Sequence, residues 1–156
     1  MNSKKKKVCL AASSGGHFEQ LMMLEKIMLD YDCFVLTEKT SYNTKSNGQK
    51  FYYTLQVNRK EKLFLLKMVW IALQSLIVFA KERPDVVICT GVLAMIPMCM
   101  YAKIFGKKLI YIESFAKITS PTETGKLLYK FADQFYVQWE SMKEIYPNAI
   151  CLGGIY

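Results

Sequence analysis

Two short polar segments contain the residue types that could bind and process a ligand. The first is Ser13-Ser14-Gly15-Gly16-His17. Two glycines let the backbone approach a ligand closely, and the free N–H groups at the start of a following helix suit a phosphate. The imidazole of His17 could hydrogen-bond that phosphate or transfer a proton. A tight strand-to-helix turn capped by Ser14 would explain the same residues without a ligand.

The second polar segment begins with Glu113 and Ser114, directly after an apolar run. A carboxylate and a hydroxyl at the carboxyl end of a parallel strand lie where open α/β sheets bind ligands. Glu113 could deprotonate or orient a substrate hydroxyl. It could equally be structural, by capping the following loop or by pairing with a lysine. Gly91, after another apolar run, places a further flexible turn at the same predicted ligand edge.

These segments follow apolar, strand-like runs that alternate with helical segments. The expected strands span residues 7–12, 33–37, 51–57, 85–90, 108–113, 134–138 and 149–152. The expected helices span residues 17–29, 60–81, 93–105, 122–131 and 140–146. Because parallel strands need helical crossovers, the pattern predicts a Rossmann-like parallel α/β sheet with helices on both faces. The 156 residues are expected to form one domain, 1–156.

The predicted helix 60–81 has more apolar surface than one sheet face can bury. Its polar residues recur every seven positions and form one narrow stripe: Lys60, Lys67, Gln74 and Lys81. The surplus apolar surface indicates a membrane, a partner subunit or an unusually buried helix. Residues 63–80 are long enough to span a bilayer, but a span would divide one parallel sheet between its two sides. We therefore expect monotopic docking, with Lys60, Lys67 and Trp70 at the lipid interface.

The charge of the chain favours an anionic partner. Lysine and arginine outnumber aspartate and glutamate by 21 to 13, and basic residues gather at the N-terminus and around the segment 60–81. The sequence has no zinc-finger spacing and no aromatic RNA-binding strand motif, so we expect no nucleic-acid partner.

The cysteines and the single histidine give no pattern of a metal site or a disulfide framework. The five cysteines are Cys9, Cys33, Cys89, Cys99 and Cys151. They include no CxxC pair, and four of the five lie in or beside apolar runs. We expect reduced thiols, mostly in the core, and no metal. The apolar run 8–12 is too short for the core of a signal peptide, so we expect a cytoplasmic protein.

Six motifs, in order and over essentially the whole chain, carry a resemblance to one family. They are S-S-G-G-H at 13–17, P-D-V-V-I-C-T-G at 84–91, I-Y-I-E-S-F-A-K at 110–117, T-G-K-L-L-Y at 124–129, A-D-Q-F-Y-V-Q-W at 132–139 and Y-P-N-A-I-C-L-G-G-I-Y at 146–156. The series resembles the membrane-associated subunit of two-component glycosyltransferases. The eukaryotic relatives in that family serve the dolichol-pyrophosphate N-acetylglucosamine transferase, and the bacterial relatives serve capsule and exopolysaccharide synthesis.

The resemblance implies one half of a GT-B glycosyltransferase. This half would be the N-terminal, acceptor-side Rossmann-like domain, and a separate donor-binding glycosyltransferase subunit would complete it. The bacterial peptidoglycan N-acetylglucosaminyltransferase is similar, with both halves on one chain. The implied reaction transfers a sugar from a UDP-sugar to a polyprenyl-diphosphate-linked saccharide at the cytoplasmic face of the membrane. The UDP-sugar would be a substrate bound mainly by the partner, and no cofactor is implied.

The resemblance also implies roles for individual residues. The acceptor diphosphate would be held by Ser13, Ser14, Gly15 and Gly16. The acceptor hydroxyl would be oriented or deprotonated by His17 or Glu113, with His17 ranked first, and Gly91 and Ser114 would lie at the ligand edge. The partner would contact Leu152, Ile155 and Tyr156. The eukaryotic relatives carry an N-terminal membrane segment, whereas here residues 1–7 lead into the first strand, so anchoring would fall to the basic front, the apolar helices or the partner.

Two other classes of function stay open. The chain could be a non-catalytic scaffold that brings the donor-binding subunit to the membrane. A stand-alone nucleotide-binding enzyme would need a ribose-binding acid near the end of the second strand. Glu38 lies there, but the glycine pattern differs from that of dinucleotide-binding turns.

Overall fold

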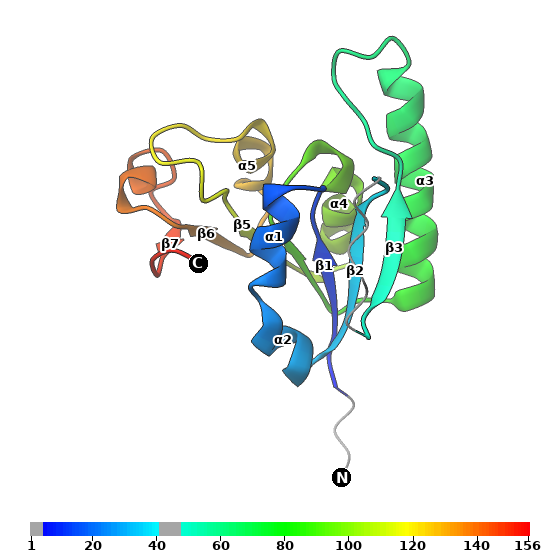
Figure 1. Ribbon diagram of the computed structural model, residues 1–156, viewed down its shortest axis with the longest axis horizontal. Helices are drawn as coiled ribbons and strands as arrows, with labels where there is room; N and C mark the ends of the chain where they lie inside the picture. Colours follow the sequence, from blue (N-terminus) through cyan, green and yellow to red (C-terminus); the bar gives the residue numbers. More distant parts are fainter. Residues whose placement is uncertain (1–4, 41–47) are drawn as a thin grey trace.

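Seven parallel strands form one sheet in the order β3-β2-β1-β4-β5-β6-β7 (Figure 1). The computed structural model describes residues 5–40 and 48–156. The strands are β1 Lys7–Ala11, β2 Asp32–Glu38, β3 Lys50–Thr54, β4 Val86–Cys89, β5 Lys108–Ile112, β6 Gln134–Val137 and β7 Ile150–Cys151. Ala11 pairs with Leu36 on one side and with Cys89 on the other, so β1 and β4 end level and β2 continues beyond them to Glu38.

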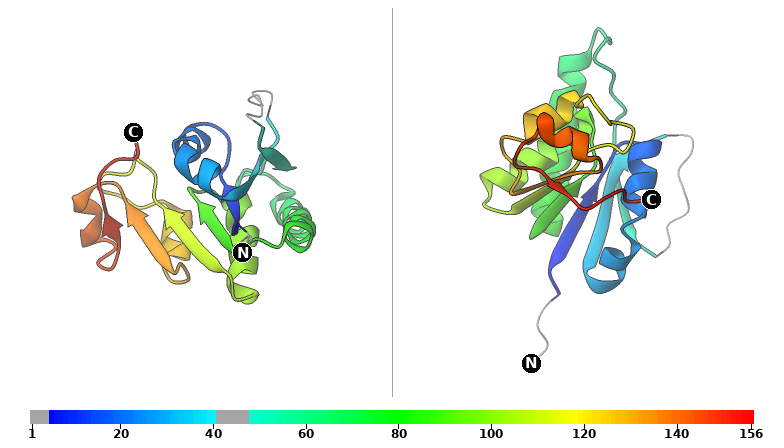
Figure 2. Two further views of the ribbon diagram at one scale, coloured as in Figure 1. Left: turned by 90° about the horizontal axis from the view of Figure 1, so that it is seen from below. Right: turned by 90° about the vertical axis from the view of Figure 1, so that its left-hand side faces the viewer.

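Helices lie on both faces of the sheet (Figure 2). They are α1 Gly16–Met22, α2 Glu25–Asp30, α3 Phe64–Glu82, α4 Ile96–Ile104 and α5 Glu123–Leu128, with 3₁₀ helices η1 Leu93–Met95 and η2 Glu140–Glu144. The chain moves outward from β1 through β2 to β3, then crosses back and continues from β4 to β7 in the opposite direction. Right-handed crossovers therefore place α1 and α2 on one face and α3 to α5 on the other. The predicted Rossmann-like sheet is confirmed.

The central strands are apolar on both sides because both of their faces are covered. In β1, Val8 and Leu10 pack toward α1 and α2, whereas Cys9 and Ala11 face the larger core beneath α3 and α4. Such strands read as continuous apolar runs, which is why the sequence predicted them. The cysteines at 9, 33, 89 and 99 are buried and Cys151 is partly exposed, and all five are free thiols.

Several predicted element boundaries differ from the structure. The predicted helix 17–29 is divided into α1 and α2, because Leu24 adopts a non-helical conformation between them. The predicted helix 60–81 begins only at Phe64. Before it, the Asn58 side-chain oxygen accepts the backbone N–H of Lys60, and this local bond competes with helix formation. The predicted helix 140–146 is the shorter 3₁₀ helix η2.

Candidate functional site

The carboxyl edge of the sheet brings the glycine-rich turn after β1 against the turn after β4. The backbone N–H of Ser13 donates to the carbonyl of Gly91 at 3.1 Å, and the N–H of Thr90 donates to the carbonyl of Ala11 at 3.2 Å. Gly15 and Gly16 are exposed, and no atom beyond their chain neighbours and the backbone of α1 lies within 4 Å of a Cβ built at either. Open space therefore adjoins this turn at the edge where a ligand was predicted.

The orientation of the His17 ring is fixed by the turn after β4. Its Nδ1 lies 2.6 Å from the carbonyl oxygen of Thr90, and the Thr90 hydroxyl donates to the His17 carbonyl at 2.8 Å. A carbonyl only accepts hydrogen bonds, so Nδ1 carries a proton. In the neutral imidazole, Nε2 is then the nitrogen with a lone pair, and it is the atom that could accept a proton from a substrate.

A buried carboxyl group, which the sequence indicated only as a possible ribose ligand, lies near the same turn. Glu38, at the end of β2, is 7% exposed. Burial raises the pKa of Glu38, and the nearby backbone N–H groups of Val57 and Ser14 act in the opposite direction. The N-cap of α1 is Gly15 and no side chain caps this helix, so the alternative of a cap by Ser14 is wrong.

The carboxyl group of Glu113 is enclosed by the start of α5. Glu113 is 1% exposed, and its carboxyl oxygens accept bonds from the N–H groups of Ser114 at 2.9 Å and Thr122 at 3.2 Å. The hydroxyls of Thr122 and Tyr146 also donate to it, and a Cβ at Gly125 would lie 2.2 Å from Oε2. This arrangement matches the capping alternative for Glu113 and leaves the carboxyl group no open side.

Two buried glutamines fix the main chain around Glu113. The Gln20 side chain on α1 donates to the Glu113 carbonyl at 3.2 Å and accepts the N–H of Phe115 at 3.1 Å. The Gln138 side chain, after β6, donates to the same carbonyl at 2.8 Å. The sequence indicated no role for either glutamine, although Gln138 lies within one of the six family motifs. Two segments distant in the sequence therefore hold the Glu113–Phe115 loop in place.

The C-terminal residues fold back onto that loop. The Ile155 N–H donates to the Gln138 side-chain oxygen at 2.9 Å, and the Tyr156 ring meets Phe115 edge-on at a centroid distance of 5.1 Å. Leu152 is 81% exposed and Tyr156 remains largely exposed. The three residues predicted to contact a partner thus lie beside the carboxyl edge with apolar surface in solvent.

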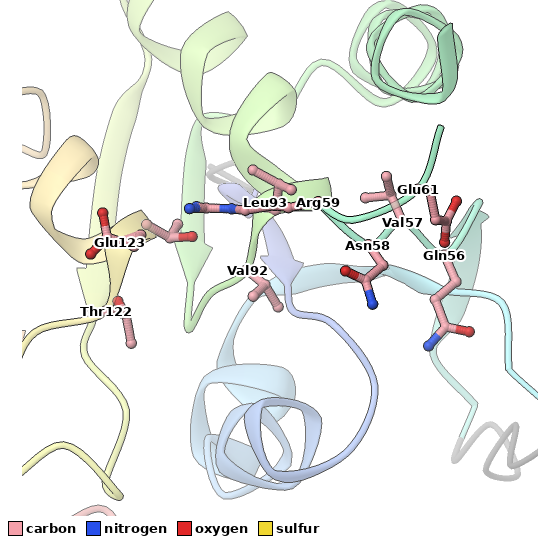
Figure 3. A pocket seen from close by; sticks show the side chains of 10 residues that line it. Gln56, Val57, Asn58, Arg59, Glu61, Val92, Leu93, Thr122 and Glu123 are labelled. Atoms are coloured by element: carbon pink, nitrogen blue, oxygen red, sulfur yellow. The ribbon is translucent and has the colours of Figure 1, made fainter. Parts of the chain in front are cut away.

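A cavity of about 550 Å³ opens at the same edge (Figure 3). It lies between the β3–α3 loop, the turn after β4 and the start of α5. Its lining is mostly polar with a small apolar part: Gln56, Val57, Asn58, Arg59, Glu61, Val92, Leu93, Thr122, Glu123 and Thr124. The sequence analysis predicted no ligand site here, because the lining comes from segments far apart in the chain. Val92 follows Gly91, so the cavity adjoins the turn that holds His17.

The exposed apolar residues of α3 form one surface on the side of the helix opposite the sheet. We call it the α3 apolar face: Leu65, Leu66, Val69, Trp70, Leu73 and Ile77, each at least 48% exposed. Ile71, Ser75 and Val78 are buried on the opposite side. Among the described residues, α3 alone is long and apolar enough to cross a membrane, and 22% of its apolar window is buried. Figure 1 shows α3 along the outer side of the molecule.

The predicted docking residues border the α3 apolar face. Lys60 is exposed before α3, and Trp70 belongs to the face itself. Lys67 is partly buried and forms a salt bridge with Glu61. Its charge is therefore partly neutralised within the protein.

Within residues 5–40 and 48–156, no group of three or more histidine, cysteine, aspartate or glutamate side chains is placed to hold a metal ion. We therefore assign no residue of this part of the chain to a metal.

Solved structures with the same fold are longer than this chain. Acinetobacter baumannii MurG superimposes with a TM-score of 0.71 at 18% identity, over 87% of this chain and 42% of MurG. UDP-N-acetylglucosamine 2-epimerase from Rickettsia bellii superimposes with a TM-score of 0.72 at 11% identity, over 97% of this chain and 45% of the epimerase. The chain spans less than half the length of either. This likeness agrees with the expected half of a GT-B glycosyltransferase fold.

Sequence comparison assigns the chain to a family. The human UDP-N-acetylglucosamine transferase subunit ALG14 is 26% identical over 180 residues, which cover 95% of this chain and 82% of the human protein. The Saccharomyces cerevisiae subunit ALG14 is 23% identical over 179 residues, covering 93% of this chain and 74% of the yeast protein. Residues 35–155 match a family described as "Oligosaccharide biosynthesis protein Alg14 like". Because that match covers most of its length, the chain belongs to the Alg14-like family of oligosaccharide biosynthesis proteins.

Proposed function

We propose that this chain is the acceptor-side subunit of a two-chain, membrane-associated glycosyltransferase. The pair transfers a sugar from a UDP-sugar to a polyprenyl-diphosphate-linked saccharide. The observation that carries the proposal is the family match, together with human and yeast relatives named as UDP-N-acetylglucosamine transferase subunits. The named relatives are eukaryotic, so the capsule or exopolysaccharide context stays an expectation.

Membrane docking in this proposal uses the α3 apolar face. Its side chains point away from the core, and Ile104 and Phe105 at the end of α4 are also exposed. Phe105 stacks on the buried Phe79 of α3 at a centroid distance of 5.2 Å, so the end of α4 lies against α3. The opposite side of α3 packs on the sheet, so the helix lies along the membrane and does not cross it. The chain is peripheral, on the cytoplasmic face.

The catalytic role falls to His17. Its Nδ1–H is held by Thr90, which leaves Nε2 to accept the proton of the acceptor hydroxyl. Glu113, the second predicted candidate, is enclosed and is proposed as a structural residue. The acceptor-diphosphate site expected from the sequence at Ser13, Ser14, Gly15 and Gly16 stays a prediction, and the open space at the two glycines leaves room there for part of the acceptor.

The partner docks on the side of the molecule where the C-terminal residues lie. Leu152, Ile155 and Tyr156 provide apolar surface there. No described helix covers β6 and β7 on the face that carries α1 and α2 (Figure 2). Tyr136 and Ile150, which pair with each other, remain partly exposed. A surface with these two properties suits a second subunit better than solvent.

The proposal is tested with the chain and the donor-binding protein that co-purifies with it. Transfer to a lipid-linked acceptor is measured for wild type, His17→Ala and the exposed neighbour Glu19→Ala as control. General base catalysis is worth about 10²–10⁴-fold, so His17→Ala should lose that much turnover while the control retains it. Unchanged turnover in His17→Ala would favour the scaffold alternative. Tight UDP-sugar binding to the chain alone would favour the stand-alone enzyme.

A further inference from the structure

The cavity beside Arg59 is a polar site for which neither the family resemblance nor the motifs provided a role. We propose that it binds the sugar of the lipid-linked acceptor, with Arg59 as the ligand of the attached diphosphate in place of the glycine-rich turn expected from the sequence. The inference rests on the proposed function and adds the place where the acceptor head group binds. Its volume of about 550 Å³ lies within the range of roughly 300–1,000 Å³ that is usual for small-molecule sites.

The charge pattern around the cavity leaves Arg59 available to an anion. Figure 3 shows its guanidinium extending from the β3–α3 loop across the cavity toward Glu123. Glu123 is paired with Lys126 at 2.8 Å, and Glu61 is paired with Lys67. Lys126 and, more weakly, Arg59 lower the pKa of Glu123.

Both carboxylates at the cavity thus have lysine partners of their own. Arg59 forms no salt bridge with any residue in the described part of the chain. A guanidinium without such a partner binds phosphate oxygens through two parallel hydrogen bonds.

The remaining lining suits a sugar ring. Gln56 and Asn58 are exposed and supply amide groups that can bond sugar hydroxyls. The Asn58 oxygen accepts the Lys60 N–H at 3.1 Å, which leaves the amide nitrogen as a donor. Val92 and Leu93 form an apolar wall for the C–H face of the ring.

The order of features along the molecule matches the order of groups in a lipid-linked sugar. The β3–α3 loop that carries Arg59 leads directly into α3, whose apolar face is proposed to lie on the membrane. The cavity follows, and its wall residue Val92 is next to Gly91, which contacts the His17 ring. The lipid would therefore lie against α3, and the diphosphate would bind Arg59. The sugar would occupy the cavity, and the reacting hydroxyl would lie at His17.

Binding is tested on the isotope-labelled chain in detergent micelles by nuclear magnetic resonance. The probes are farnesyl diphosphate and its glucosyl and N-acetylglucosaminyl esters. We expect at least one sugar-bearing probe to shift the backbone amides of Asn58, Arg59 and Thr124. Arg59→Gln should weaken binding of all three probes at least tenfold. The matched control Lys62→Gln removes one charge from the same loop without touching the cavity and should stay within twofold of wild type.

The inference is overturned if Arg59→Gln binds the probes as wild type does, if only the amides of Gly15 and Gly16 respond, or if no probe binds. Because Arg59 is exposed, its variant should unfold at the wild-type temperature. In the reconstituted pair, Arg59→Gln should raise the acceptor KM at least tenfold with a smaller change in kcat.

A wild-type pair that transfers sugar, with an unchanged KM in Arg59→Gln, would overturn the cavity assignment and leave the proposed function standing. A wild-type pair that transfers no sugar would overturn the proposed function, and the binding titration would still decide the cavity.

Discussion

Gly91 and His17 pack so closely that the position of the imidazole depends on the absence of a side chain at residue 91. A Cβ built there would lie 3.0 Å from Cε1 and 3.1 Å from Nδ1 of His17, and Gly91 has a φ of 113°. The carbonyl of the preceding residue, Thr90, is the one that holds Nδ1. The turn after β4 therefore orients the candidate base both by contact and by hydrogen bonding.

Replacing Gly91 by alanine should disturb the site more than the fold. The left-handed backbone should cost about 1–3 kcal/mol of unfolding free energy, and the displaced His17 ring should lower turnover at least tenfold. Gly106→Ala is the matched control, since Gly106 also has a positive φ of 64° but open space at its Cβ. Chemical denaturation and transfer by the reconstituted pair measure the two effects. Equal turnover in both variants would show that the Gly91 contact does not position His17.

Glu113 should contribute to stability and little to catalysis. Glu113→Gln replaces one accepting oxygen by a donor that faces the N–H groups of Ser114 and Thr122, which should cost about 1–3 kcal/mol. Turnover per folded molecule should stay within a few-fold of wild type. Burial and the neighbouring Glu113 carboxylate raise the pKa of Tyr146 well above its usual value, so its hydroxyl remains a donor to residue 113.

The control for Glu113 is Glu140→Gln, which changes an exposed carboxylate paired with Lys143 within one turn. It should alter the unfolding free energy by less than about 0.5 kcal/mol. If Glu113→Gln instead keeps its stability and loses turnover, the carboxyl group has a catalytic role.

The sequence was sufficient for the sheet but not for the contacts that assemble the site. Continuous apolar runs identify β1 and β4 because both faces of these strands are covered. Because the strands are parallel, their carboxyl ends lie at the same edge of the sheet. The approach of Glu38 to the Ser14 backbone and the bonds between Gln20 and the Glu113–Phe115 loop join residues from different elements. Their side chains show no period that would distinguish them from ordinary polar residues.

The cavity was even harder to predict from the sequence than these contacts. Its lining combines residues 56–61, 92–93 and 122–124, which meet only after the sheet has formed. The excess apolar surface of the segment 60–81, in contrast, was readable from composition, since a surface helix needs a narrower apolar stripe. Only the structure showed which side of α3 is turned away from the core.

The stability of the fold should decrease at acidic pH because of Glu82, at the amino edge of the sheet. Glu82 is 6% exposed; its burial acts to raise its pKa, but hydrogen bonds from Lys50, Tyr52 and Lys7 outweigh this and lower the pKa to about 2. Because the folded-state pKa lies below the ordinary value of 4.5, the stabilisation is present above about pH 4.5. It is lost as the pH falls from there toward 2.

Urea denaturation of wild type and Glu82→Gln between pH 7 and pH 2.5 checks this dependence. The stability advantage of wild type should be constant from pH 7 to about pH 5 and should shrink below it. Glu144→Gln, at an exposed position, is the control and should follow the wild-type curve. An advantage that does not change with pH would mean that the carboxylate of Glu82 is not stabilised by its lysine and tyrosine partners.

Membrane binding should depend on the α3 apolar face and not on apolar surface in general. Leu66→Ser with Val69→Ser should lower the affinity for anionic lipid vesicles at least tenfold, because burying each side chain in lipid is worth about 1.5–3 kcal/mol. Both residues are exposed, so the unfolding free energy should change by less than about 1 kcal/mol. Leu29→Ser, at an exposed leucine of α2, is the control and should bind as wild type does. Vesicle flotation that finds the double variant still bound would assign the face to a partner subunit, because the helix would then cover protein and not lipid.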